Sequence, residues 1–164
     1  MASLLQVLPQ ATINSLQAAL QATKNDSVST LLNCNEYITY FLNNPTQTNW
    51  NTMNTMIQTF MSTRTAIPGL AVLITMPDGK VAYDTRKNGT TNTYANYQAG
   101  TIEENHNTRV SIMTALLSNN GVGYESKISS TTGDYTSYQT IRIGYNPELA
   151  LGCCRVSVTL PPPS

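Results

Sequence analysis

Apolar residues recur every three or four positions through the first 66 residues, the spacing that places them on one face of a helix. The stripes of the three expected helices are Ile13, Leu16 and Leu20; Val28, Leu31, Leu32, Ile38, Phe41 and Leu42; and Trp50, Met53, Met56, Ile57, Phe60 and Met61. Asn25 or Asp26 can cap the second helix, and the residue before Pro45 ends it. Ile67-Pro68-Gly69 ends the third. We therefore predict a helical N-terminal segment over residues 1–66.

From residue 70 the pattern changes to that of β-strands. The run LAVLITM, Leu70 to Met76, is apolar and β-rich, and KVAYDT, Lys80 to Thr85, alternates apolar and polar positions. Pro77-Asp78-Gly79 between them has the composition of a tight turn. The two runs therefore predict a β-hairpin, and the Asn- and Thr-rich residues 86–99 that follow predict a polar loop.

A short helix and three further strands are expected after this loop. Asn107 or Thr108 can cap the helix, and Gly121 stands where a left-handed C-terminal residue is favoured. The expected apolar stripe of this helix is Val110, Met113, Leu116 and Leu117. The strands are predicted over 123–130, 135–144 and 152–160. In the last of them, Cys154, Val156, Val158 and Leu160 should share one face, and Cys153, Arg155, Ser157 and Thr159 the other.

The order of elements predicts an α+β fold. N-terminal helices precede a five-stranded antiparallel sheet with one connecting helix, and the helices should lie on one face of the sheet. We expect the helical segment over 1–66, the α+β domain over 67–160, and a Pro-rich tail over 161–164 that cannot extend a sheet.

Charge is scarce in this chain of 164 residues. Charged side chains make up 11% of the residues, and nine basic residues balance nine acidic ones. Without a basic patch, binding of nucleic acid through its phosphates is not expected. No apolar run is long enough to span a bilayer, and MASLLQVLPQATINSL lacks the basic and long apolar regions of a signal peptide. We therefore expect intracellular synthesis and no membrane insertion.

The Asn- and Thr-rich, charge-poor composition resembles that of minor capsid proteins of large DNA viruses. This resemblance implies a structural protein whose partners are other subunits of an assembly, with the virion as its location. The stripe of Trp50, Met53, Met56 and Phe60 is interpreted as core, with a partner interface as the alternative. Three cysteines, two of them adjacent, favour buried free thiols over a disulfide framework.

Three segments resemble the Cache class of PAS-like extracytoplasmic sensor domains, as found in phosphate-type sensor histidine kinases. LAVLITMPDGKVAYDT is similar to the hairpin of that class, with its D-G turn and V-x-x-D-S/T strand. ENHNTRVSIMTALLSNNGVG resembles its E-N-H-x-x-R-P-E segment, with Val110 in place of the proline, and KISSTTGDYTSYQTIRI resembles the hairpin that follows. The resemblance covers residues 70–160 and implies a PAS-like sheet that can hold a small ligand. The membrane helices and kinase of those sensors are not expected here.

The single histidine, His106, is the natural candidate for chemistry. Glu103-x-x-His106 has the spacing of one di-iron ligand pair, but one histidine cannot complete such a site within a chain, which leaves only a site shared between chains. There is no G-x-S-x-G motif for a catalytic triad, and the cysteine pair falls within a predicted strand. We therefore expect no catalytic residues, no metal, no cofactor and no enzyme.

Two interpretations remain for the segment ENHNTR. In the first, Asn105, His106 and Arg109 are structural and satisfy backbone groups at the helix entry, with Arg109 donating to loop carbonyls or to Asp84. Asp78 and Gly79 are then a plain turn. In the second, His106 and Arg109, together with Tyr138, contact a ligand. The sequence thus predicts a structural, non-enzymatic module of a larger assembly, and the alternative is a stand-alone domain that binds a small molecule.

Overall fold

The computed structural model of the protein describes residues 36–63, 65, 68–144 and 146–160. The helix expected over residues 13–20, the capping residues Asn25 and Asp26, Cys34 and the Pro-rich tail fall outside the described residues. Residues 36–43 are helical, and α2 spans Gln47–Ser62. Thr46 caps α2 by accepting a hydrogen bond from the backbone of Asn49 at 3.1 Å. The described part of the second predicted stripe and the stripe of α2 are thus helical, while Val28, Leu31 and Leu32 fall outside the described residues. The helix α2 ends at Ser62, before the expected stop at Ile67-Pro68-Gly69.

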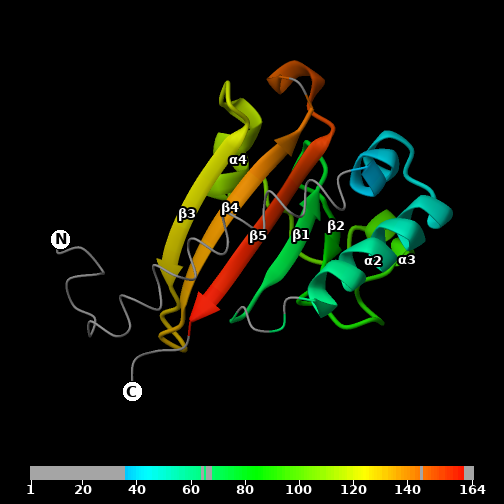
Figure 1. Ribbon diagram of the computed structural model, residues 1–164. Helices are drawn as coiled ribbons and strands as arrows, with labels where there is room; N and C mark the ends of the chain where they lie inside the picture. Colours follow the sequence, from blue (N-terminus) through cyan, green and yellow to red (C-terminus); the bar gives the residue numbers. More distant parts are fainter. Residues whose placement is uncertain (1–35, 64, 66–67, 145, 161–164) are drawn as a thin grey trace.

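Five strands form one antiparallel sheet, which confirms the predicted fold class (Figure 1). The strands are β1 (Ala71–Thr75), β2 (Val81–Asp84), β3 (Val122–Ile128), β4 (Tyr135–Ile143) and β5 (Gly152–Leu160). Their spatial order is β2-β1-β5-β4-β3, so the first strand pairs with the last. A short 3-10 helix, Pro147–Leu149, joins β4 to β5. The final strand therefore lies at the centre of the sheet, and β2 and β3 lie at its edges.

The two faces of the sheet differ sharply in chemistry. Strand pairing places Val72, Ile74, Tyr83, Cys154 and Val156 on one face, called here the apolar face. It places Asp84, Thr140, Arg142, Arg155 and Ser157 on the other, called here the polar face, and all of these side chains are buried.

Helices cover both faces, not one as the sequence analysis expected. On the apolar face, Gln58 of α2 bonds to Tyr83. On the polar face, Thr140 bonds to Ser111 of α4 (Val110–Leu117). Figure 1 accordingly shows α2 and α4 on opposite sides of the sheet. The strand β5 needs cover on both sides because its polar residues are as buried as its apolar ones.

Residues 94–99 form a helix where the sequence analysis expected only loop. This helix, α3 (Tyr94–Ala99), is capped at its start by Thr93 and at its end by Gly100, whose φ of 74° is left-handed. Tyr97 anchors it in the core, with its ring centroid 5.3 Å from that of Phe41. Six residues are too few to show a helical period, so α3 depends on its caps and on this contact.

The predicted orientation of α4 is wrong. Its buried residues are Ser111, Ile112 and Ala115, whereas Val110, Met113 and Leu117 are 56%, 43% and 72% exposed and Leu116 is only partly buried. The helix turns the small side chains of Ser111 and Ala115, together with Ile112, to the sheet, because it lies very close to β3. A Cβ placed on Gly123 would stand 2.0 Å from the backbone oxygen of Ser111.

The ends of α4 also differ from the prediction. Arg109 is the N-cap residue in place of Asn107 or Thr108, and its side chain makes no capping hydrogen bond to the helix. At the C-terminal end of α4, where Gly121 was expected to end the helix, the last carbonyl groups are bonded by the side chain of Arg142. Its Nη1 donates to the carbonyls of Ala115, Leu116 and Ser118 at 3.2, 3.2 and 2.6 Å, and its charge favours this negative end of the helix. Gly121, with φ of 69°, lies in the turn before β3.

Candidate functional site

The turn of the first hairpin is joined to the loop that leads into α4. The backbone N–H of His106 donates to the carbonyl of Gly79 at 2.8 Å, and Asn105 Nδ2 donates to the carbonyl of Asp78 at 3.2 Å. The Asp78 carboxylate accepts from the backbone of Lys80 at 3.0 Å. A Cβ on Gly79 would lie 2.4 Å from the nitrogen of Asn107. These contacts hold the hairpin turn against the loop before α4. The polar groups that form them are therefore already hydrogen-bonded within the protein.

His106 is buried, with 2% of its surface exposed. Its Nδ1 lies 2.7 Å from the carbonyl oxygen of Glu104. Because a carbonyl only accepts, Nδ1 carries the hydrogen in this contact. Burial lowers the pKa of His106, and the charges of Arg155 and Arg109 lower it further against the opposing hydrogen bond to Glu104. The imidazole is therefore held in its neutral form.

Arg109 and Asp84 do not pair with each other. Arg109 forms an ion pair with Glu104, within its own loop. Asp84 is instead bound by Arg86, whose Nε and Nη2 reach its two carboxylate oxygens at 3.0 and 2.8 Å. Burial would raise the pKa of Asp84, but the hydrogen bonds and charge of Arg86 outweigh it and hold that pKa below its usual value. Asp84 pairs with Arg86 because the two residues are only two positions apart in the chain.

Arg155 lies at the centre of the polar face and was not singled out by the sequence analysis. It is 3% exposed, and its guanidinium lies 4.5 Å from the ring centroid of Tyr138. Its Nε has no hydrogen-bond partner among the described residues. Burial lowers the pKa of Arg155 to about 10, and the charge of Arg86 adds to this effect. The sequence held one indication of this role. Arg155 is the only charged residue in the run GCCRVSV, whose other residues are typical of a buried strand.

The three residues predicted to bind a ligand are gathered around Arg155. Tyr138 lies under its guanidinium, and both His106 and Arg109 are electrostatically coupled to it. None of the three lines the pocket described next. Their role as ligand contacts stays a prediction.

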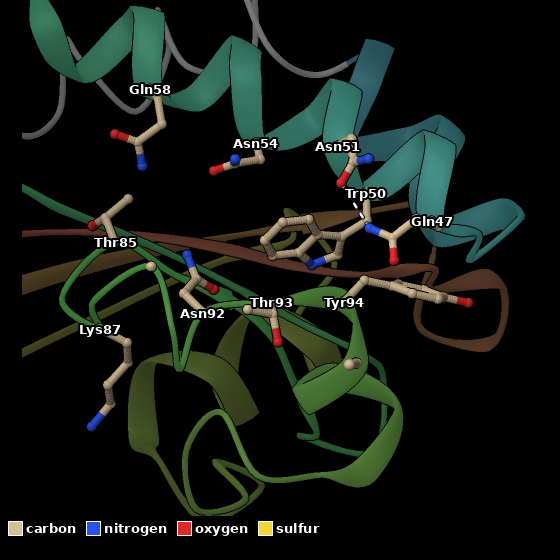
Figure 2. A pocket seen from close by; sticks show the side chains of 12 residues that line it. Gln47, Trp50, Asn51, Asn54, Gln58, Thr85, Lys87, Asn92, Thr93 and Tyr94 are labelled. Atoms are coloured by element: carbon tan, nitrogen blue, oxygen red, sulfur yellow. Dashed lines mark hydrogen bonds between the residues drawn. The ribbon is translucent and has the colours of Figure 1, made fainter.

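A pocket of about 550 Å³ lies between α2 and the segment that follows β2 (Figure 2). It is called here the amide pocket, because five of its lining residues are asparagine or glutamine. The lining residues are Gln47, Trp50, Asn51, Asn54, Gln58, Thr85, Lys87, Gly89, Asn92, Thr93, Tyr94 and Ala95. Its volume lies within the usual range for small-molecule sites, roughly 300–1,000 Å³.

Two hydrogen bonds to Tyr83 fix the side chains at the middle of this pocket. Gln58 Nε2 donates to the Tyr83 hydroxyl at 2.7 Å, and that hydroxyl donates to Asn54 Oδ1 at 2.7 Å. On the facing wall, Asn92 Oδ1 accepts from the backbone N–H of Asp84 at 3.1 Å. The pocket is thus pre-formed by contacts with β2, and its amides do not depend on a ligand for their orientation.

The amide pocket carries almost no charge. Lys87 is the one Asp, Glu, Lys or Arg among the described residues that line it, and its Nζ lies 3.0 Å from a carboxylate oxygen of Glu103. In Figure 2 the side chain of Lys87 points away from α2. The field inside the pocket therefore comes mainly from amide and hydroxyl dipoles.

The stripe considered as a partner interface is packed inside the chain. Trp50, Met53 and Phe60 are buried in the hydrophobic core, and Met56 packs against it. Trp50 Nε1 donates to the carbonyl of Ala82 at 2.9 Å. The interface interpretation is therefore wrong for the three buried residues, because the apolar face of the sheet takes the place of a partner.

The cysteines of β5 offer no reactive group. Cys153 and Cys154 are buried and free, as predicted, and burial raises the pKa of Cys153 to about 12. Within the described ranges, no three His, Cys, Asp or Glu side chains are grouped so that they could hold a metal ion.

No protein-family model matches the chain, and no curated protein matches it. Among solved structures the chain is similar to the ligand-binding domain of the Campylobacter jejuni chemoreceptor Tlp3, in complex with 4-methylisoleucine. The TM-score is 0.50 at 16% identity, and the match covers 96% of this chain and 60% of that chain. The present chain thus spans three fifths of the domain it resembles.

This likeness confirms the sensor-like α+β fold that the sequence resemblance implied. The resemblance to viral capsid proteins finds no support in it. In the part of the chain that the structure describes, no helix combines the length and apolar character needed to cross a membrane.

Proposed function

We propose that this chain is a non-catalytic domain that binds a small molecule in the amide pocket. The observation that carries the proposal is a pre-formed pocket of about 550 Å³, fixed by hydrogen bonds to β2, on a sensor-like fold. Pre-formed polar groups favour binding because little conformational entropy is lost when the ligand arrives. The structural similarity to a chemoreceptor domain supports the same function.

The lining of the pocket favours binding over catalysis. It contains no described histidine, cysteine, aspartate or glutamate, the commonest groups for proton transfer, and its lysine, Lys87, is paired with Glu103 at 3.0 Å. Its threonines therefore have no histidine or carboxylate within the described lining to activate them as nucleophiles. The candidates for such chemistry lie elsewhere and are neutralised. His106 is buried and neutral, and the thiol of Cys153 is held protonated by its raised pKa. This supports a domain that recognises a molecule and leaves it unchanged.

Thermal denaturation of the full chain against a broad panel of small metabolites tests the proposal. A compound present at 100 times its dissociation constant stabilises a protein by about 2.7 kcal/mol, which for a chain of this size raises the melting temperature by roughly 5–10 °C. We expect at least one compound to produce such a shift.

The shift should disappear in the variant Asn54→Ala and persist in Asn107→Ala. Asn107 is an exposed asparagine that does not line the pocket, so it provides the matched control. If no compound stabilised the protein, or if Asn54→Ala left the shift intact, the proposed site would be wrong.

A further inference from the structure

We propose that the ligand of the amide pocket is an uncharged, polyhydroxylated molecule such as a monosaccharide. This inference rests on the proposed function and adds the chemical class of the ligand. Three observations support it. They are the amide groups that have no hydrogen bond within the protein, the lack of charged groups in the pocket, and the aromatic side chains in its lining.

Each amide of the pocket has one half fixed by the protein and the other half without a hydrogen bond to any described residue. The oxygens of Asn51, Asn54 and Asn92 accept bonds from Gln47, Tyr83 and the Asp84 backbone at 2.8, 2.7 and 3.1 Å. Their Nδ2 groups are left as donors. Gln47 and Gln58 show the reverse, because their Nε2 groups donate to Asn51 and Tyr83 and their Oε1 atoms are left as acceptors.

The pocket therefore presents three donors and two acceptors. Asn92 has a fixed orientation, because its partner is a backbone N–H that only donates. The Gln47–Asn51 pair, and the Gln58–Asn54 pair on either side of the Tyr83 hydroxyl, would each still present one donor and one acceptor if both amides turned over together. A carboxylate only accepts and an ammonium only donates, whereas a hydroxyl does both. A ligand with several hydroxyl groups can satisfy both sets at once, whichever group meets which amide.

The charges of the pocket disfavour a zwitterion. The chemoreceptor domain that this chain resembles is in complex with 4-methylisoleucine, an amino acid. The described lining offers no carboxylate to an ammonium, and Lys87 is already paired with Glu103 at 3.0 Å. Desolvating an ion without a partner costs far more than desolvating a hydroxyl that finds one. Similarity of fold thus does not carry over the class of ligand.

Aromatic side chains complete the lining. Trp50 is buried and fixed through Ala82, and half-buried Tyr94 is fixed by a bond from its hydroxyl to the carbonyl of Pro45 at 2.9 Å. Figure 2 shows both side chains among the amides. The C–H face of a sugar ring can pack on the half-buried ring of Tyr94, with the edge of Trp50 beneath, while its hydroxyls meet the amides.

Isothermal titration of the full chain with D-glucose, D-ribose and myo-inositol, and in parallel with L-isoleucine and succinate, tests this inference. We expect at least one of the three polyols to bind, and neither charged compound to bind. Affinity for the polyol should be the same at low and high salt, because no charge pair contributes to it.

The variants Asn54→Asp and Asn92→Asp make the test specific. In each, the Oδ1 can still accept its present bond, while the free Nδ2 donor is replaced by an acceptor. We expect polyol affinity to fall at least about tenfold, the loss that corresponds to one hydrogen bond. Asn107→Asp, the same change outside the pocket, should leave it unaltered, and melting temperatures verify that each variant is folded.

The outcomes separate the class of ligand from the function itself. If L-isoleucine or succinate bound in the pocket and no polyol did, the ligand class would be wrong while the proposed function stood. Polyol binding that survived both Asp variants would also overturn the inference. If these compounds and the wider panel all failed to bind, the inference and the proposed function would fall together.

Discussion

The amide pocket and the polar face of the sheet are both polar, but they use their hydrogen-bonding capacity in opposite ways. On the polar face, most of the charged groups are bonded within the chain, as Asp84 is to Arg86 and Arg142 is to the carbonyls at the end of α4. In the amide pocket, the groups are neutral and each amide keeps one half unpaired.

The difference has a physical cause. A charge that is buried without a partner costs several kcal/mol, so Asp84 is paired with Arg86 and Arg142 is bonded to carbonyl oxygens, while Arg155 is the exception. A neutral amide that borders a pocket can leave one group to water at little cost. In this fold, the polar face therefore holds the polar residues that affect stability. The amide pocket holds those that can bind a ligand. Asp84 joins the two regions, since its backbone orients Asn92.

The largest effect is expected for Asp84→Ala. The carboxylate is fully buried and accepts three bonds from Arg86. Its loss should lower the free energy of unfolding by about 3 kcal/mol, measured by urea denaturation. Asn54→Ala, in the pocket, should cost about 1 kcal/mol or less. Equal losses at the two positions would remove the contrast between the regions.

His106→Gln should lower the free energy of unfolding by about 1–3 kcal/mol, because it removes a buried partner of a loop carbonyl. It should also change the pH dependence. The pKa of His106 is depressed in the folded state, so below its ordinary pKa near 6.5 the unfolded chain binds a proton that the folded chain does not. Wild-type stability should therefore fall as pH drops from about 7 towards 5.

The variant should lack this slope, since the chain has a single histidine. The contribution of Asp84 lies in a separate window. Its folded pKa is depressed, so its contribution is present above about pH 4 and is lost as the pH falls further. Stability curves at a series of pH values measure both effects. An unchanged slope between pH 7 and 5 in His106→Gln would show that the imidazole is not the titrating group.

Arg155→Met should change the free energy of unfolding less than Asp84→Ala or His106→Gln. The guanidinium is buried, its Nε lacks a hydrogen bond to any described residue, and Arg86 repels it. A methionine keeps much of the apolar contact with Tyr138 without a buried charge. We expect the free energy of unfolding to stay within about 1 kcal/mol of the wild-type value or to rise. A loss above 2 kcal/mol would reveal a partner that stabilises the charge.

The smallest effect is expected on the cysteines of β5. Both thiols are buried, and the pKa of Cys153 is about 12. Iodoacetamide should therefore leave Cys153 and Cys154 unmodified in the native chain at neutral pH and modify them after denaturation. Peptide mass spectrometry identifies the modified positions. Modification without denaturant would show that β5 is accessible.

The sequence by itself determined most of the local structure. The hairpin of β1 and β2 could be predicted because Pro77-Asp78-Gly79 has few other conformations, and the five strands and α2 followed from their periods. The stripe of Trp50, Met53 and Phe60 correctly indicated a buried face. These features depend on residues near one another in the chain, where spacing and turn chemistry are decisive.

The tertiary structure alone decided the rest. The orientation of α4 depends on its close approach to Gly123, its C-terminal cap on Arg142 of another element, and α3 on a contact with Phe41. The amide pocket could not be foreseen either. A polar residue on a helix is expected to face water, and only packing shows that Asn54 and Gln58 face Asn92 across a pocket. Spacing along the chain gives the face of an element, but what lies opposite that face depends on packing between distant segments.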